Sequence, residues 1–211
     1  MEAVKFWSQI AISFCAVLLS PGSWAGAAPS EALEALLQNV DHVTAEFSQQ
    51  LIDGNGYLLE SSTGTLYLDK PFFRWDILEP FAQTIVGKGE SIEVYDPDLE
   101  QVTQRNMTGI IDQAPLMLLN QTQSFVTQYF DVKQQLSTEG LDQFVLTPLS
   151  AETLFAHLEL FFAGPDLHSI NIIDHSGQET VIRFSAYQTT QTLPKNLFNL
   201  EYPSGTDFVR G

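Results

Sequence analysis

The chain has 211 residues, 44% of them hydrophobic and 11% aromatic, and carries 26 acidic against 9 basic side chains. The formal net charge of −17 argues against a nucleic-acid partner and against electrostatic docking on anionic lipid. This acidity serves solubility, or it speeds the encounter with a basic protein partner.

The first 27 residues have the layout of a secretory signal peptide. Lys5 precedes an apolar run over residues 6–19, which is too short to cross a bilayer comfortably. Small residues follow, and we expect cleavage near residues 25–28. The mature chain, which lacks Glu2 and Lys5, keeps 25 acidic and 8 basic side chains. At about 184 residues it is long enough for one domain, residues 28–211.

Cys15 is the only cysteine, and it lies within this leader. The residues before it, Ser13 and Phe14, lack the small residue that a bacterial lipobox places before its cysteine. We therefore expect that the protein is not itself a lipoprotein. The mature chain can form neither a disulfide nor a thiolate, and export without disulfides fits a bacterial periplasm.

An amphipathic helix is predicted over residues 31–42. Ser30 follows Pro29 as a candidate N-cap, and apolar residues then recur at helical spacing. They are Leu33, Leu36, Leu37, Val40 and Val43. Near Val43 the period changes to two, which predicts a strand. The sequence Asp-Gly-Asn-Gly at residues 53–56 then predicts a hairpin turn.

Short strands separated by turn signals dominate the remaining chain. We expect them near residues 57–69, 72–78, 83–87, 91–96, 100–105, 129–135, 142–147, 157–162, 167–174, 179–187 and 197–202. Successive strands with short connections predict a mainly β protein with few helices (α+β), an antiparallel meander curled into a barrel or half-barrel.

The segment of residues 109–125 breaks this pattern. Pro115 suits the first turn of a helix, and the four residues after it are apolar nearly all round. These residues are Leu116, Met117, Leu118 and Leu119. Such a helix must be covered on most sides. It caps the open face of a half-barrel together with the N-terminal helix, or both helices simply pack on a sheet.

No motif for catalysis, metal binding or a cofactor is found. The four histidines form no HExxH pattern, and the chain has no GxSxG motif and no phosphate-binding loop. Asp96 and Asp98 flank Pro97, which favours a turn over a catalytic carboxylate pair. What remains is an excess of aromatic residues. A sheet that is apolar on both faces needs two covering layers, or it has a hydrophobic cavity on one side.

Several blocks of the sequence form a distinctive combination. They are GTLYLDKPFFRWDILEP at residues 64–80, QTIVG at 83–87, EVYDPDLEQV at 93–102, FVLTP at 144–148, DHSGQ at 174–178 and YPSGTD at 202–207. In this order they resemble the LolA family of periplasmic carriers of outer-membrane lipoproteins, and the resemblance covers roughly residues 31–209. Weaker matches are the FSQ sequence at residues 47–49 and the leucines after Pro115.

The resemblance implies an incomplete, strongly curved antiparallel β-barrel, a half-barrel whose open side is covered by helices that act as a lid. Its hydrophobic cavity receives the acyl chains of a lipoprotein. The residues implied for cargo binding are Phe47, Leu66, Leu68, Phe73, Trp75, Ile77, Leu116, Leu118 and Leu119.

The family also holds its lid through a basic residue just before the strand proline. That position is Lys70 in this chain, where arginine is the better-known residue. Lysine can donate to helix carbonyls but lacks the planar fork of arginine. Arg74 shares this task of lid latch, or it is a surface residue that pairs with Asp76 or Glu79.

The implied function is that of a monomeric carrier without cofactor or enzymatic activity. Its implied partners are acylated lipoproteins, an inner-membrane ABC exporter that loads it, and an outer-membrane receptor of similar fold. Two other functions stay open. One is a periplasmic lipid-binding or sensor module of the same fold, and the other is a periplasmic hydrolase that uses two carboxylates.

Overall fold

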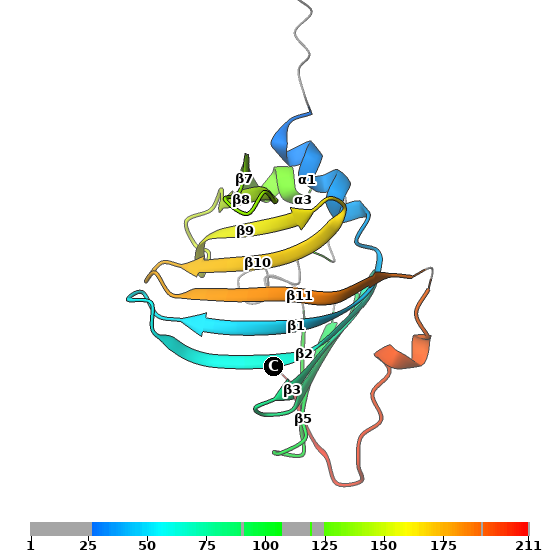
Figure 1. Cartoon of the computed structure of the whole chain (residues 1–211). Coiled ribbons are helices and arrows are strands. Elements are labelled where there is room, and N and C mark those ends of the chain that lie inside the picture. The colour runs from blue at the N-terminus through cyan, green and yellow to red at the C-terminus, as the bar shows by residue number, and fades with distance from the viewer. Residues whose placement is uncertain (1–26, 90, 107–118, 120–124, 191, 211) are drawn as a thin grey trace, which may run out of the picture.

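The computed structural model describes residues 27–89, 91–106, 119, 125–190 and 192–210. In this part of the chain twelve strands form one sheet, in the order β12-β6-β5-β4-β3-β2-β1-β11-β10-β9-β8-β7 (Figure 1). The strands at the two ends of this order, β12 and β7, do not pair with each other, so the sheet is open. The prediction of a mainly β, half-barrel fold is confirmed.

The helices and strands follow one another with short connections over most of the chain. In chain order they are α1 (Pro29–Gln38), β1 (His42–Ile52), β2 (Leu58–Asp69), β3 (Phe72–Glu79), β4 (Gln83–Lys88), β5 (Ser91–Asp96), β6 (Gln101–Asn106), α3 (Phe125–Tyr129), β7 (Phe130–Leu136), β8 (Asp142–Pro148), β9 (Phe155–Ala163), β10 (Asp166–Asp174), β11 (Glu179–Thr189), the 3₁₀ helix η2 (Lys195–Phe198) and β12 (Asp207–Arg210).

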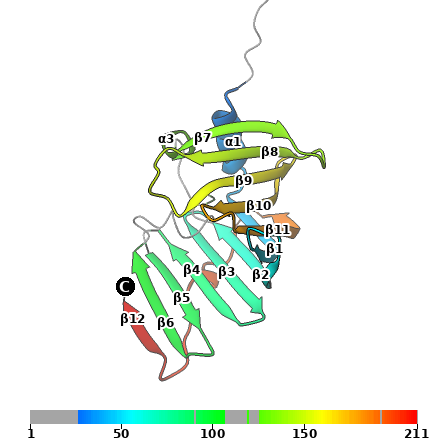
Figure 2. The ribbon, with the colours of Figure 1, turned by 90° about the vertical axis from the view of Figure 1, so that its left-hand side faces the viewer.

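Apart from β1 and β12, the strands of the sheet form two antiparallel meanders, which we call the first arm (β2–β6) and the second arm (β7–β11). They meet at β1, which pairs with β2 on one side and with β11 on the other. Figure 2 shows the strands of the first arm turned strongly away from those of the second, so the sheet curves. Strong right-handed twist between neighbouring strands accounts for this curvature.

The N-terminal helix is shorter than predicted and begins earlier. Pro29 occupies its first turn and Ala28 is the N-cap, so Ser30 lies inside the helix. The helix ends at Gln38 with Asn39 as its C-cap, and the Asn39 side-chain amide donates to the Ala35 carbonyl at 3.2 Å. The change of period near Val43 was therefore the better guide to the boundary, since β1 begins at His42.

The predicted strand at residues 197–202 is wrong. Residues 195–198 form η2, and the chain then runs to β12, which pairs in parallel with β6. The apolar residues of this C-terminal segment cover the convex face of the first arm instead of extending the sheet. Phe198 packs on Phe72 with ring centroids 5.8 Å apart, and Tyr202 packs on Tyr95 at 5.2 Å.

Hydrogen bonds fix this C-terminal segment to the convex face. The Tyr202 hydroxyl donates to the Glu93 carboxylate at 3.2 Å. Burial and the nearby Glu93 charge raise the pKa of Tyr202 above its usual range, so this hydroxyl keeps its proton. Burial by itself would raise the pKa of Glu93, but Lys88, Tyr202 and Gln104 donate to its carboxylate, and they and the Lys88 charge hold this pKa below its usual value.

The predicted helix after Pro115 falls outside the described residues, apart from Leu119, which is helical and buried. Residues 1–26, the greater part of the expected signal peptide, also lie outside them. Within the described ranges, no helix is both long enough and apolar enough to cross a bilayer.

Candidate functional site

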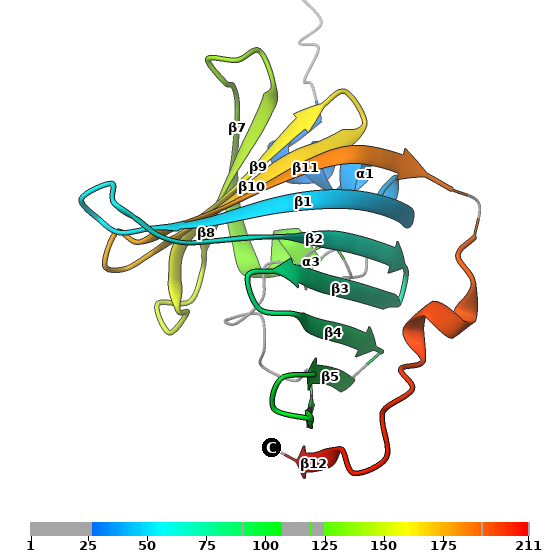
Figure 3. The ribbon, with the colours of Figure 1, turned by 60° about the horizontal axis from the view of Figure 1, so that its bottom comes forward.

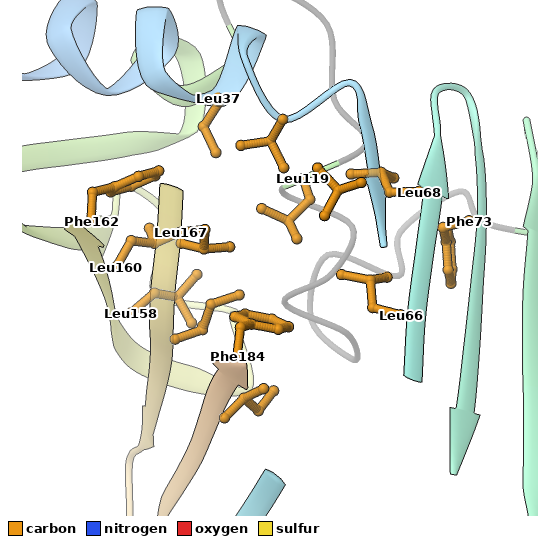
Figure 4. Packing of buried hydrophobic residues seen from close by; sticks show 14 of the residues in the cluster. Leu37, Leu66, Leu68, Phe73, Leu119, Leu158, Leu160, Phe162, Leu167 and Phe184 are labelled. Atoms are coloured by element: carbon orange, nitrogen blue, oxygen red, sulfur yellow. The ribbon is translucent and has the colours of Figure 1, made fainter. Parts of the chain in front are cut away.

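One cluster of buried apolar side chains lies along the concave face of the sheet, and we call it the concave cluster. Both arms contribute to it, together with α1, α3 and Leu119. Its strand members include Val43, Ala45, Phe47, Leu66, Leu68, Phe73, Trp75, Ile92, Phe144, Leu146, Leu158, Leu160, Phe162, Ile170, Ile182 and Phe184. Figure 4 shows side chains of β2 and β3 facing those of β9, β10 and β11, with Leu37 and Leu119 near the space between them.

The alternation of apolar residues along β2 and β3 places the predicted cargo residues in this cluster. Leu66 and Leu68 are 2% and 1% exposed, and Phe73 and Trp75 are each 2% exposed. Ile77 is partly buried against them. Leu66 pairs with Trp75 across the two strands, so both side chains lie on one face. Of the predicted residues, Leu116 and Leu118 lie outside the described part of the chain.

Aromatic stacking joins the first arm to the centre of the sheet. The Phe47 and Trp75 rings are stacked, with centroids 3.7 Å apart and planes inclined by 17°. Phe184 of β11 meets the Trp75 ring edge-on at 6.3 Å. Phe184 was not predicted as a site residue, although its alternation with Ile182 along one strand could have placed it on this face.

Two glycines allow the aromatic rings to lie flat on the strands. A Cβ atom on Gly87 would lie 2.0 Å from Cε1 of Phe73, and one on Gly64 would lie 2.6 Å from Cζ of Phe47. Any side chain at either position would lift a ring off the sheet. The GTL and VGK sequences therefore shape the concave face as much as the large residues do.

The α1 helix covers part of the concave cluster and contacts elements from both arms. Leu33 and Leu37 are buried in the cluster, and the helix packs against β7 and α3. Its C-terminal end lies beside the β2–β3 turn, where Lys70 donates from Nζ to the Leu37 carbonyl at 2.7 Å. The same ammonium is 3.0 Å from Oδ1 of Asp41. A helix C-terminus attracts a positive charge, so this lysine is well placed to hold the helix.

The hydrogen bonds of Arg74 go to β3 and η2, and not to α1. Its Nε donates to both oxygens of the Asp76 carboxylate, at 2.9 and 2.8 Å, and its Nη1 donates to the Leu197 carbonyl at 3.0 Å. It therefore holds η2 on the convex face. Lys70 and Arg74 do not share one strand, because β2 ends at Asp69 and β3 begins at Phe72.

The acidic and histidine side chains considered as candidates for chemistry make local contacts in the described part of the chain. No group of three or more His, Asp or Glu side chains there could hold a metal ion. The Asp96 carboxylate accepts from the Leu99 backbone N–H at 3.0 Å, as expected for turn chemistry. His42 pairs with Asp69 at 2.5 Å, and His175 lies 2.9 Å from the Thr153 carbonyl, so both have local structural partners.

An open, curved antiparallel sheet with one continuous apolar face under a helix defines the class of half-barrel proteins with an apolar interior. The family model for "Outer membrane lipoprotein carrier protein LolA" matches residues 38–201. The chain belongs to this family.

Individual proteins agree with this assignment. The outer-membrane lipoprotein carrier protein of Hahella chejuensis is 34% identical over 212 residues, which span 100% of this chain and 99% of that protein. The protein of the same name from Dechloromonas aromatica is 35% identical, over 95% of this chain and 96% of that protein. An uncharacterized conserved protein from Thermus thermophilus has a similar structure, with a TM-score of 0.57 and 16% identity over 86% of this chain and 98% of that one. At such low identity the last likeness supports the fold alone.

Proposed function

We propose that residues 28–211 form a periplasmic carrier that binds the acyl chains of lipoproteins and delivers them to the outer membrane. The observation that carries this proposal is the concave cluster, an apolar face that spans both arms under a helix attached by few polar contacts. The membership of the chain in this family and the names of its relatives support lipoproteins as the cargo. The residues that the structure describes at this site offer burial, so we propose a carrier and not an enzyme.

The energetics of transfer limit how tightly the cargo can be held. Burial of an acyl chain gains about 0.8 kcal/mol per CH₂ group. Three full chains would exceed the practical ceiling of about −20 kcal/mol for non-covalent binding. Because the membrane offers the same gain, net transfer is close to balance. Loading therefore needs an energy source outside this chain, which we propose is an inner-membrane ABC exporter. Unloading goes to an outer-membrane receptor of similar fold.

The test of this function uses spheroplasts that make a labelled lipoprotein. The exported protein is added, and the label in the soluble fraction is measured. We expect label to appear in a one-to-one complex with the protein. If a known carrier releases the lipoprotein in parallel and this protein does not, the carrier function is wrong. Bound acyl lipid without exporter-dependent loading would favour the lipid-binding or sensor module.

The lid latch is proposed for Lys70 alone. A hydrogen bond from a charged donor contributes about 1.5–3 kcal/mol, so Lys70→Leu should raise the population with α1 detached by about tenfold or more. The Lys70→Arg variant keeps a donor and serves as the control. Hydrogen exchange of the α1 amides measures the detachment directly, and the rate of cargo transfer to the receptor measures its consequence. Wild-type exchange and transfer in Lys70→Leu would show that the latch lies elsewhere.

A further inference from the structure

The β1–β2 hairpin extends beyond the neighbouring strand of the first arm. The β2–β3 ladder begins with the pair Thr63 and Glu79, whereas β2 itself begins at Leu58. Figure 3 shows this hairpin projecting past the β3–β4 turn. On the β3 side, residues 58–62 of β2 therefore pair with no strand in the described part of the chain. We call residues 58–62 the free edge of β2.

A proline accounts for the end of β3 at this point. Pro80 follows Glu79 and has no backbone N–H to donate to a ladder, so β3 cannot continue alongside β2. The step leaves an open hollow of about 380 Å³ between Ser61, Ser62 and Thr63 on one side and Glu79 and Pro80 on the other. This hollow lies where the next residues of a longer third strand would run.

Exposed apolar side chains lie at the projecting end of the β1–β2 hairpin and in the β3–β4 turn. Leu58 and Leu59 are each 56% exposed, Tyr57 is 70% exposed, and Phe81 in the β3–β4 turn is 74% exposed. Such a gathering of large apolar residues beside a free strand edge is unfavourable in water. It is typical of a surface that another molecule covers.

The charges near the end of β3 indicate what kind of partner would bind there. Residues 51–69 and 77–87, which include both hairpin turns, contain four carboxylates and no lysine or arginine. Hydrogen bonds from Tyr57 and Asn55 lower the pKa of one of these, Asp53, more than its slight burial raises it, and so favour its charged form. Anionic lipid is repelled by such a surface, and a lipid offers no ladder of backbone groups. An extended protein segment with basic and apolar side chains fits both features.

We propose that the free edge of β2 is a docking site for a protein partner, which adds an extended basic and apolar segment as a strand beside residues 58–62. Backbone hydrogen bonds would give affinity, and contacts with Leu59 and Phe81 and with the Glu60 and Glu79 carboxylates would give specificity. The site lies outside the concave cluster, so it acts in partner recognition and not in acyl binding.

The test uses the exported, ¹⁵N-labelled protein and a fluorescent peptide of eight alternating valine and lysine residues. We expect saturable binding with backbone amide shifts centred on residues 58–63 and 79. A peptide with glutamate in place of lysine, and a valine–lysine peptide interrupted by a central proline, should each bind at least tenfold more weakly. Equal binding of the three peptides, or shifts confined to β7 or β12, would overturn the proposal.

Variants separate this site from the acyl-binding face. Leu59→Ser combined with Phe81→Ser should weaken the valine–lysine peptide at least tenfold and leave acyl binding unchanged. The control is Leu136→Ser on β7, a leucine that is 72% exposed in a distant part of the sheet. If phosphatidylglycerol vesicles bind through Leu59 and Phe81 and the peptide does not, the site is a membrane contact and the proposal is wrong.

Discussion

Trp75→Glu is expected to abolish retention of acylated cargo, and Leu66→Glu should do the same. Both side chains are 2% exposed and lie side by side on the concave face of the first arm. A carboxylate there must be desolvated or protonated, at a cost of several kcal/mol. A loss of about 3 kcal/mol is about a hundredfold in affinity. The measurement is the fraction of labelled lipoprotein that co-purifies with each variant after release from spheroplasts.

Controls distinguish loss of binding from loss of folding. Leu136→Glu places the same charge on an exposed position and should bind cargo like the wild type. Trp75→Phe keeps an aromatic ring beside Phe47 and should retain most binding. Export and the urea unfolding midpoint of each variant are measured alongside. Unchanged cargo binding by folded Trp75→Glu and Leu66→Glu would remove the concave cluster from the site.

Trp75 also provides a direct optical measurement. The other two tryptophans, Trp7 and Trp24, lie in the expected signal peptide, so residues 28–211 contain Trp75 alone. An acyl chain brominated near its methyl end should quench this fluorescence when it enters the concave face, and the unbrominated lipid should not. Absence of quenching under saturating brominated lipid would place the lipid elsewhere on the molecule.

Gly64→Ala is expected to destabilise the fold by about 3 kcal/mol or more, because the new methyl group has no room. The Cβ would lie 1.8 Å from the Asp76 carbonyl oxygen and 2.6 Å from Cζ of Phe47. Relief of this clash would require β2 and β3 to move apart, because the Asp76 carbonyl oxygen belongs to the backbone. The urea unfolding midpoint measures the effect.

The matched control is Gly56→Ala in the β1–β2 turn. A Cβ on Gly56 meets nothing within 4 Å, but its φ of +87° is unfavourable for alanine. That strain should cost about 1–2 kcal/mol. If Gly64→Ala is no more destabilising than Gly56→Ala, the close approach of β2, β3 and the Phe47 ring does not limit this position.

Much of the fold could be predicted because strand alternation is a local property. The alternation through Leu66, Leu68, Phe73 and Trp75 predicted the strands, and the family resemblance implied that these side chains face the interior. The sequence could indicate Lys70 as the position of the proposed latch but not its acceptor, because the Leu37 carbonyl is 33 residues away in the chain. No local pattern identifies that oxygen as an acceptor.

The C-terminal segment could not be predicted because its contacts are non-local. Leu197 and Phe198 are as apolar as strand residues, and their pattern does not distinguish a strand from a segment laid across one. The apolar convex face of the first arm, with Val86 and Val102 fully buried, was an available clue. An apolar sheet face needs a covering layer, and the C-terminal segment supplies it here.

The meeting of the two arms at β1 has a consequence for how the chain folds. β1 pairs with β2, which is nearby in sequence, but Val43 also pairs with Thr189 in β11, which is far away in the chain. Closing so long a loop is entropically unfavourable, and folding rates fall as contacts become less local. We expect the centre of the sheet to form late and slowly. In the export to the periplasm that we propose, the core of the sheet cannot close until nearly all of the chain has crossed the inner membrane.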